Sequence, residues 1–272
     1  MKDLLIHVRD FESRTPAAGF GIRLAAKFGS SVTAVYACPE PNYVAPAYTP
    51  ELMTAIMENT RQLVKNAVQA RQGFVEWAAT LGVPQCEWLV AEGGPADALV
   101  QAATRHDLMV LDHGDEERGS PWDIPGLILR AGVPCIVVPH HGTHFEPFER
   151  IAIAWNGSPE AMRAVHSALP FLQGKQVLLL WGEEREKYHG VEWDPPFNIN
   201  EYLHRRGVMV EQRTVSAKHD DVGGVLLDEA MRFRADLLVM GAYGRTRFSE
   251  WMLGGATRHV LAWANIPVLL CH

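Results

Sequence analysis

The sequence contains an internal repeat, and this feature restricts the fold more than any other. Residues 107–111, Asp-Leu-Met-Val-Leu, match residues 236–240, Asp-Leu-Leu-Val-Met. Further along each half, residues 132–138 match residues 265–271. Because the matching segments keep their order and approximate spacing, the 272 residues are expected to form two copies of one fold.

Each half alternates short apolar runs with segments of helical length. In the first half these Val-, Leu- and Ile-rich runs fall near residues 4–8, 32–38, 84–91, 108–112 and 135–138. Such alternation predicts a parallel sheet that is covered by helices on both faces. We therefore predict an α/β protein with two tandem doubly wound domains, each a five-stranded parallel sheet, over residues 1–139 and 150–272.

Local signals predict several helix boundaries. Thr15, followed by proline, is a typical N-cap, and Gly29 lies where that helix should end. Ser158, also followed by proline, and Gly174 have the same roles in the second half. Residues 51–81 are expected to form one long helix, because apolar residues recur at a spacing of three and four, at positions 63, 67, 70, 74, 78 and 81.

Charge and composition exclude several classes of function. The chain has 25 Lys and Arg against 32 Asp and Glu, a net charge of −7, which disfavours binding to nucleic acid and to anionic membranes. There is no long apolar stretch typical of a membrane span, and the N-terminus lacks the apolar core of a secretory signal. We therefore expect a cytoplasmic protein.

Cysteine and histidine patterns do not indicate a metal site. The four cysteines are far apart in the sequence, and three lie in apolar runs, which favours buried structural thiols over disulfides or zinc ligation. The linker after residue 139 carries His140, His141 and His144 between two prolines. A flexible linker gives these imidazoles no fixed geometry, so no metal is expected there.

A glycine-rich loop in the second half is the strongest candidate for a binding site. Gly241 follows a buried strand, Gly244 comes shortly after it, and Gly254 precedes the last helix. Glycines let backbone N–H groups approach a phosphate, a helix N-terminus adds positive potential, and Arg245 would add charge. The alternative interpretation is that these glycines serve only turns and packing.

Aromatic residues near this loop also have two interpretations. Trp155 and Trp181 end the first two expected strands of the second half, where they would flank a bound base or pack in the core. Met240 would lie beneath the base, and otherwise belongs to the core.

With these residues the chain resembles a tandem universal stress protein, in which the order of elements matches over both halves and the motifs are specific in the second half. The nucleotide motif of the universal stress protein family is Gly, two residues, Gly, nine residues, Gly, then Ser or Thr. Gly241, Gly244 and Gly254 keep this spacing, but Gly255 stands at the Ser/Thr position. Asn156 stands where the family usually has an acidic residue. The resemblance implies Rossmann-like domains of the adenine nucleotide alpha-hydrolase-like type and an ATP site, with Mg²⁺, formed by Ala154, Trp155, Asn156, Met240, Gly241, Gly244, Arg245, Gly254, Gly255 and Ala256.

The first half departs from the same motif. Arg9 replaces the acidic residue, and Asp112 and Asp115 replace the first two glycines. Two carboxylates would repel a phosphate, so we predict that this half binds no nucleotide and is a structural or regulatory partner. The resemblance further implies that residues 135–138 and 268–271 pair, which would make the two domains an intramolecular pseudo-dimer.

No set of residues indicates catalysis. Hydrolysis needs a positioned base or a metal-binding carboxylate, and the loop offers only Glu250. We therefore predict a non-enzymatic regulatory or protective protein of the stress response, with unidentified protein partners and a homodimer as a further form. A nucleotide-free interaction module and a slow ATPase are the alternative hypotheses.

Overall fold

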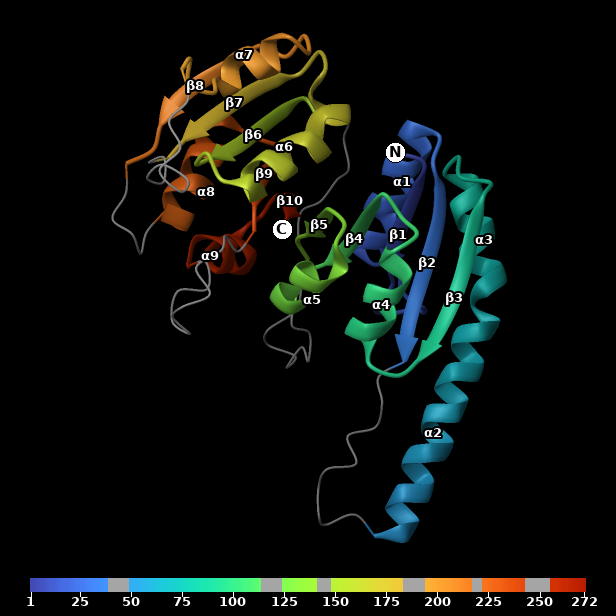
Figure 1. The fold of residues 1–272 in the computed structure, drawn as a ribbon. Helices are drawn as coiled ribbons and strands as arrows, with labels where there is room; N and C mark the ends of the chain where they lie inside the picture. The colour runs from blue at the N-terminus through green and yellow to red at the C-terminus, as the bar shows by residue number, and fades with distance from the viewer. Residues whose placement is uncertain (39–48, 114–123, 141–147, 183–193, 217–221, 243–254) are drawn as a thin grey trace. The chain divides into compact units, whose positions relative to one another are not determined.

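The computed structural model describes residues 1–38, 49–113, 124–140, 148–182, 194–216, 222–242 and 255–272 (Figure 1). The chain divides into two compact units, Met1–Val133 and Pro134–His272.

The first unit contains a four-stranded parallel sheet in the order β3-β2-β1-β4. In β1, Leu4, Leu5 and Ile6 are all fully buried although successive side chains point to opposite faces. Both faces of the sheet are therefore covered. Its elements are β1 (Asp3–His7), α1 (Pro16–Phe28), β2 (Ser31–Cys38), α2 (Pro50–Gln69), α3 (Arg71–Thr80), β3 (Cys86–Glu92), α4 (Pro95–Ala103), β4 (Leu108–Asp112) and α5 (Ile124–Ala131).

The second unit contains a sheet in the order β5-β10-β9-β6-β7-β8, in which only β5 runs antiparallel to its neighbour β10. This confirms the doubly wound α/β class that was predicted from the alternation. Its elements are β5 (Cys135–Val138), β6 (Arg150–Trp155), α6 (Pro159–Leu172), β7 (Gln176–Trp181), α7 (Ile199–His204), β8 (Val210–Thr214), α8 (Val222–Phe233), β9 (Leu237–Gly241), α9 (Gly255–Trp263) and β10 (Val268–Cys271).

Strand β5 groups with the second unit, whereas the predicted boundary placed it in the first domain. The reason is its antiparallel pairing with β10, in which Val137 lies opposite Val268 and Cys135 opposite Leu270. The predicted pairing of these two segments is confirmed, and it covers one edge of β10.

The repeated aspartate has the same structural role in both units. Oδ2 of Asp107 accepts hydrogen bonds from the backbone N–H groups of Lys2 and Asp3 at the start of β1. Oδ2 of Asp236 accepts from the N–H groups of Glu149 and Arg150 at the start of β6. Asp107 therefore holds β4 beside β1, and Asp236 holds β9 beside β6.

The predicted helix caps are present. The side chains of Thr15 and Ser158 accept hydrogen bonds from the first turns of α1 and α6, and Gly29 has φ 63°, in the left-handed region that favours glycine. The single helix predicted over residues 51–81 is wrong, because it is divided into α2 and α3. At Ala70 between them, ψ is −15°, which departs from the helical value of about −42° and interrupts the regular helix.

The four cysteines are all described, and none forms a disulfide. Cys38, Cys135 and Cys271 are buried. Burial raises the pKa of Cys86 to about 11, so that its thiol stays protonated near neutral pH. In the part of the chain that the structure describes, no helix is both long and apolar enough to cross a membrane.

His7 should make the stability of the first unit sensitive to acid. Burial, together with the charge of Arg9, lowers the pKa of this imidazole to about 3. An unfolded histidine has a pKa of about 6.5. Below this pH the histidine is protonated in the unfolded chain but stays neutral in the folded chain. Stability is therefore expected to fall as the pH drops from about 6.5 towards 3, by about 2 kcal/mol between pH 7 and pH 5.

Urea unfolding of the wild type and of His7→Gln at pH 7 and pH 5 checks this expectation. The glutamine does not titrate, so the variant should lose about 2 kcal/mol less than the wild type over this interval. An equal loss in both proteins would show that other groups cause the acid sensitivity.

Candidate functional site

The carboxyl ends of β6 and β9 form the topological switch point of the second unit. The two strands are parallel neighbours, with Ile153 opposite Val239, but the chain leaves them toward β7 on one side and β10 on the other. In open α/β sheets, ligands bind in the crevice outside the strand ends at this point. The predicted site residues that the structure describes come from these strand ends and from the start of α9.

Gly241 is required by close packing at this point. A Cβ atom on Gly241 would lie 2.5 Å from the backbone nitrogen of Ala161 and 2.7 Å from the carbonyl carbon of Glu160, in the first turn of α6. The Glu160 carboxylate is itself buried and forms an ion pair with Arg163 at 2.9 Å. The first glycine of the motif therefore has a packing function that does not depend on a ligand.

Asn156 lies in the turn between β6 and α6. Its Oδ1 accepts a hydrogen bond from the backbone N–H of Ser158 at 3.2 Å, and the Ser158 hydroxyl in turn caps α6 through the N–H of Ala161 at 3.1 Å. An aspartate could accept the same bond, but Asn156 also carries an Nδ2 group that can donate to a ligand. The half-buried Ala154 precedes it by two residues on β6.

Trp155 at the end of β6 has an unusual environment. Its side chain is only 4% exposed, and its indole Nε1–H finds no acceptor among the residues that the structure describes. An unpaired buried donor costs about 1–3 kcal/mol, so an acceptor for this N–H is expected from outside the described residues. The ring of Phe197, which is 55% exposed, lies 6.2 Å from the Trp155 ring and covers part of it.

The other predicted residues have different surroundings. Trp181 lies opposite Trp155 in the pairing of β7 with β6, so both rings share one face of the sheet. Met240 is 5% exposed and pairs with Leu270, which places it in the core. Phe197 was missed, because nothing in the sequence connects a residue before α7 with the end of β6.

Helix α9 begins at Gly255, where a Cβ atom would meet none of the described residues within 4 Å. Gly255 is exposed, Ala256 is half-buried and the following Thr257 is buried. The helix therefore starts at an exposed residue and is anchored in the core two residues later, at Thr257. Three predicted site residues lie outside the described residues: Gly244, Arg245 and Gly254.

The equivalent position in the first unit holds a carboxylate. Asp112, which ends β4 as Gly241 ends β9, is 5% exposed, and its Oδ1 accepts a hydrogen bond from the N–H of Ala17 at 2.9 Å. This N–H lies in the first turn of α1, where the helix dipole favours a negative charge. Arg9 reaches the backbone oxygen of His113 at 3.5 Å, and Asp115 lies outside the described residues.

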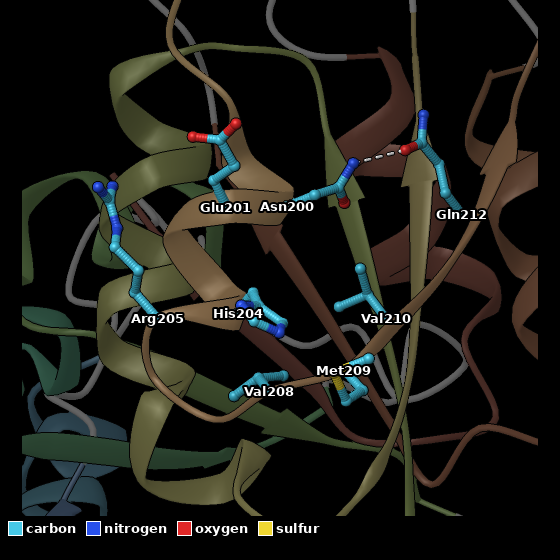
Figure 2. A pocket seen from close by; sticks show the side chains of 8 residues that line it. All are labelled: Asn200, Glu201, His204, Arg205, Val208, Met209, Val210 and Gln212. Atoms are coloured by element: carbon cyan, nitrogen blue, oxygen red, sulfur yellow. Dashed lines mark hydrogen bonds between the residues drawn. The ribbon is translucent and has the colours of Figure 1, made fainter.

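A cavity of about 470 Å³ lies between α7 and β8, away from the predicted site (Figure 2). Asn200 donates through Nδ2 to Oε1 of Gln212 at 2.8 Å across its upper side, and Figure 2 shows Glu201 and Arg205 extending away from β8. Sequence reasoning gave no signal for this cavity. Its lining residues are Asn200, Glu201, His204, Arg205, Val208, Met209, Val210 and Gln212.

Among the described residues, no three His, Cys, Asp or Glu side chains gather as metal ligands. His140 is described, whereas His141 and His144 of the linker lie outside the described residues.

Comparisons with known proteins agree with this fold. Residues 147–272 match the model of the universal stress protein family. A universal stress protein from Archaeoglobus fulgidus superposes with a TM-score of 0.69 at 14% identity, covering 99% of this chain and 95% of that chain. A protein of unknown function from Pseudomonas aeruginosa gives 0.57 at 13% identity, covering 100% of this chain and 92% of that chain. A search of curated proteins returned no match.

At these identities the superpositions establish the fold of both halves, and the family match identifies the second half. Residues 147–272 are therefore a universal stress protein domain, and the chain as a whole has the tandem fold of the universal stress proteins.

Proposed function

We propose that the second unit binds one adenine nucleotide, ATP with Mg²⁺, at the carboxyl ends of β6 and β9, and that the chain is a regulatory or protective stress protein. The observation that carries this proposal is the buried Nε1–H of Trp155, which lacks an acceptor among the described residues and lies at the switch point. Membership of the second half in the universal stress protein family supports it.

The described residues fit such a ligand. Trp155 would supply its Nε1–H donor and Asn156 its Nδ2 group to the nucleoside. The backbone N–H groups of Gly255 and Ala256 at the start of α9 would bind a phosphate. Bound Mg²⁺ would neutralise part of the phosphate charge. The Glu160 carboxylate does not oppose this binding, because it is paired with Arg163.

Gly255→Asp should weaken the binding of Mg·ATP at least tenfold, about 1.4 kcal/mol, because it adds a negative charge beside the phosphates. The open space around Gly255 means that the side chain itself is tolerated. Calorimetric titration of nucleotide-stripped protein measures this, with a wild-type stoichiometry near one per chain. Gly255→Asn is the matched control, of the same size without the charge, and should keep most of the affinity.

Absence of heat and of thermal stabilisation at millimolar Mg·ATP would contradict the proposal and leave the nucleotide-free interaction module. Equal weakening by Gly255→Asp and Gly255→Asn would also contradict it, because the charge at the start of α9 would then be irrelevant.

The substitution Trp155→Phe tests whether the Trp155 side chain donates a hydrogen bond to the ligand or only packs in the core. The substitution removes the unpaired N–H and keeps most of the aromatic surface, so the ligand-free protein should be as stable as the wild type or more stable, by up to about 1–3 kcal/mol. The affinity for ATP should fall, because the ligand loses a donor. Urea unfolding and calorimetry measure the two effects, and an unchanged affinity would remove Trp155 from the site.

We further infer that the first unit binds no nucleotide, because the Asp112 carboxylate is bound to the first turn of α1. Asp112→Ala should lower the free energy of unfolding by about 1–3 kcal/mol by leaving the buried N–H of Ala17 without this acceptor. Asp112→Asn keeps an acceptor oxygen and should cost less. Urea unfolding measures both variants, and a wild-type stoichiometry of two nucleotides per chain would refute the inference.

We propose that bound ATP is not turned over appreciably. The Glu160 carboxylate is buried beside Gly241 and paired with Arg163, so it is not placed to activate water. Metal-dependent release of phosphate by the wild type would instead favour the slow ATPase.

A further inference from the structure

Three aromatic side chains lie side by side at the end of β6 and around the start of α7. The ring centroids of Trp155 and Phe197 are 6.2 Å apart, and those of Phe197 and Tyr202 are also 6.2 Å apart. Phe197 therefore links the other two, and we call the three residues the aromatic row. Trp155 and Tyr202 are buried, whereas Phe197 is 55% exposed.

Both buried rings of the aromatic row carry a polar atom that has no hydrogen-bond partner among the described residues. These atoms are Nε1 of Trp155, an N–H donor, and Oη of Tyr202, which can donate and accept. Buried polar groups in proteins are normally hydrogen-bonded, so each exception needs an explanation. Two exceptions next to one exposed ring indicate a ligand that binds beside Phe197 and supplies the missing partners.

The surroundings of Phe197 are held in place, whereas its own ring is exposed. The ring of Tyr202 lies 5.5 Å from that of His166 on α6, and the guanidinium carbon of Arg206 lies 3.6 Å from its centroid. Asn198, the residue after Phe197, caps α7 and accepts hydrogen bonds from its first turn. The ring of Phe197 can therefore change rotamer without a shift of α7.

A planar nitrogen heterocycle meets the requirements of this place better than other classes of small ligand. Its face can stack on an aromatic ring, and its ring nitrogens can accept a hydrogen bond from an indole N–H. A sugar or a phosphate offers acceptors but no face for stacking, and an aliphatic group offers neither. The base is the part of a nucleotide that has this chemistry.

We propose that the base of the bound nucleotide stacks on the ring of Phe197 while its edge accepts a hydrogen bond from Nε1–H of Trp155. This inference rests on the proposed nucleotide site, and it makes Phe197 the residue that recognises the base. The ring of Phe197 turns aside when the nucleotide enters and then closes on the base. Trp155 directly precedes Asn156, so the base lies next to the nucleoside contact.

Calorimetric titration with Mg·ATP and with Mg·tripolyphosphate, which has no base, tests the role of Phe197. Phe197→Ala should weaken the binding of Mg·ATP about fivefold or more, because it removes the stacking surface. The same variant should change the binding of Mg·tripolyphosphate less than about twofold. Phe197→Tyr is the matched control, since it keeps the aromatic ring and should bind both ligands within about twofold of the wild type.

A third variant, Phe197→Leu, distinguishes stacking from simple apolar contact. Leucine keeps much of the apolar bulk but has no aromatic face, so it should weaken the binding of Mg·ATP nearly as much as alanine. Thermal unfolding checks that the three variants fold, which is expected because the Phe197 side chain is more exposed than buried.

Two results with Phe197→Ala would overturn the inference: a wild-type affinity for Mg·ATP, or a loss of affinity for Mg·tripolyphosphate by the same factor. Full affinity of Phe197→Leu for Mg·ATP would overturn it as well, because apolar contact without stacking would then be sufficient. A wild type that binds neither ligand would refute the nucleotide site itself, and this inference with it.

Discussion

The arrangement of both sheets depends on the hydrogen bonds that hold β4 beside β1 and β9 beside β6. Asp107 and Asp236 bind the backbone at the starts of β1 and β6, so β4 and β9 lie next to these strands and not next to β3 and β8, which precede them in the chain. This placement creates a switch point, because the chain then leaves the two neighbouring strands in opposite directions. The aspartate that is repeated in the sequence therefore makes the same backbone hydrogen bonds in both units.

The residues at the ends of β4 and β9 differ in charge: Asp112 carries a carboxylate, and Gly241 has no side chain. The start of α1 lies against the end of β4, and the start of α6 lies against the end of β9. The N–H groups at a helix start attract negative charge. In the first unit the chain supplies that charge itself through Asp112, whose carboxylate accepts from Ala17. In the second unit Gly241 brings the backbone into contact with α6 and adds no side chain. The end of β4 therefore carries a carboxylate bound to the helix start, whereas the end of β9 carries only backbone packed against it.

Much of the fold could be predicted because its signals are local. The apolar runs, the caps at Thr15 and Ser158 and the glycine after α1 each act within a few residues. The division at Ala70 and the assignment of β5 could not be predicted, since the first is a small change of one ψ angle and the second depends on pairing with β10. At the site, the covering of Trp155 by Phe197 joins residues that are far apart in the sequence.

The glycines of the motif do not all carry the same information about function. Gly241 is needed wherever β9 meets α6 this closely, so its presence is explained by packing alone. Among the described residues, Gly255 has open space around it, and their packing gives no reason to prefer glycine there. The donor of Trp155 likewise has no acceptor within the described part of the chain, a cost that the packing seen there does not explain. These two features, and not Gly241, support the proposed ligand.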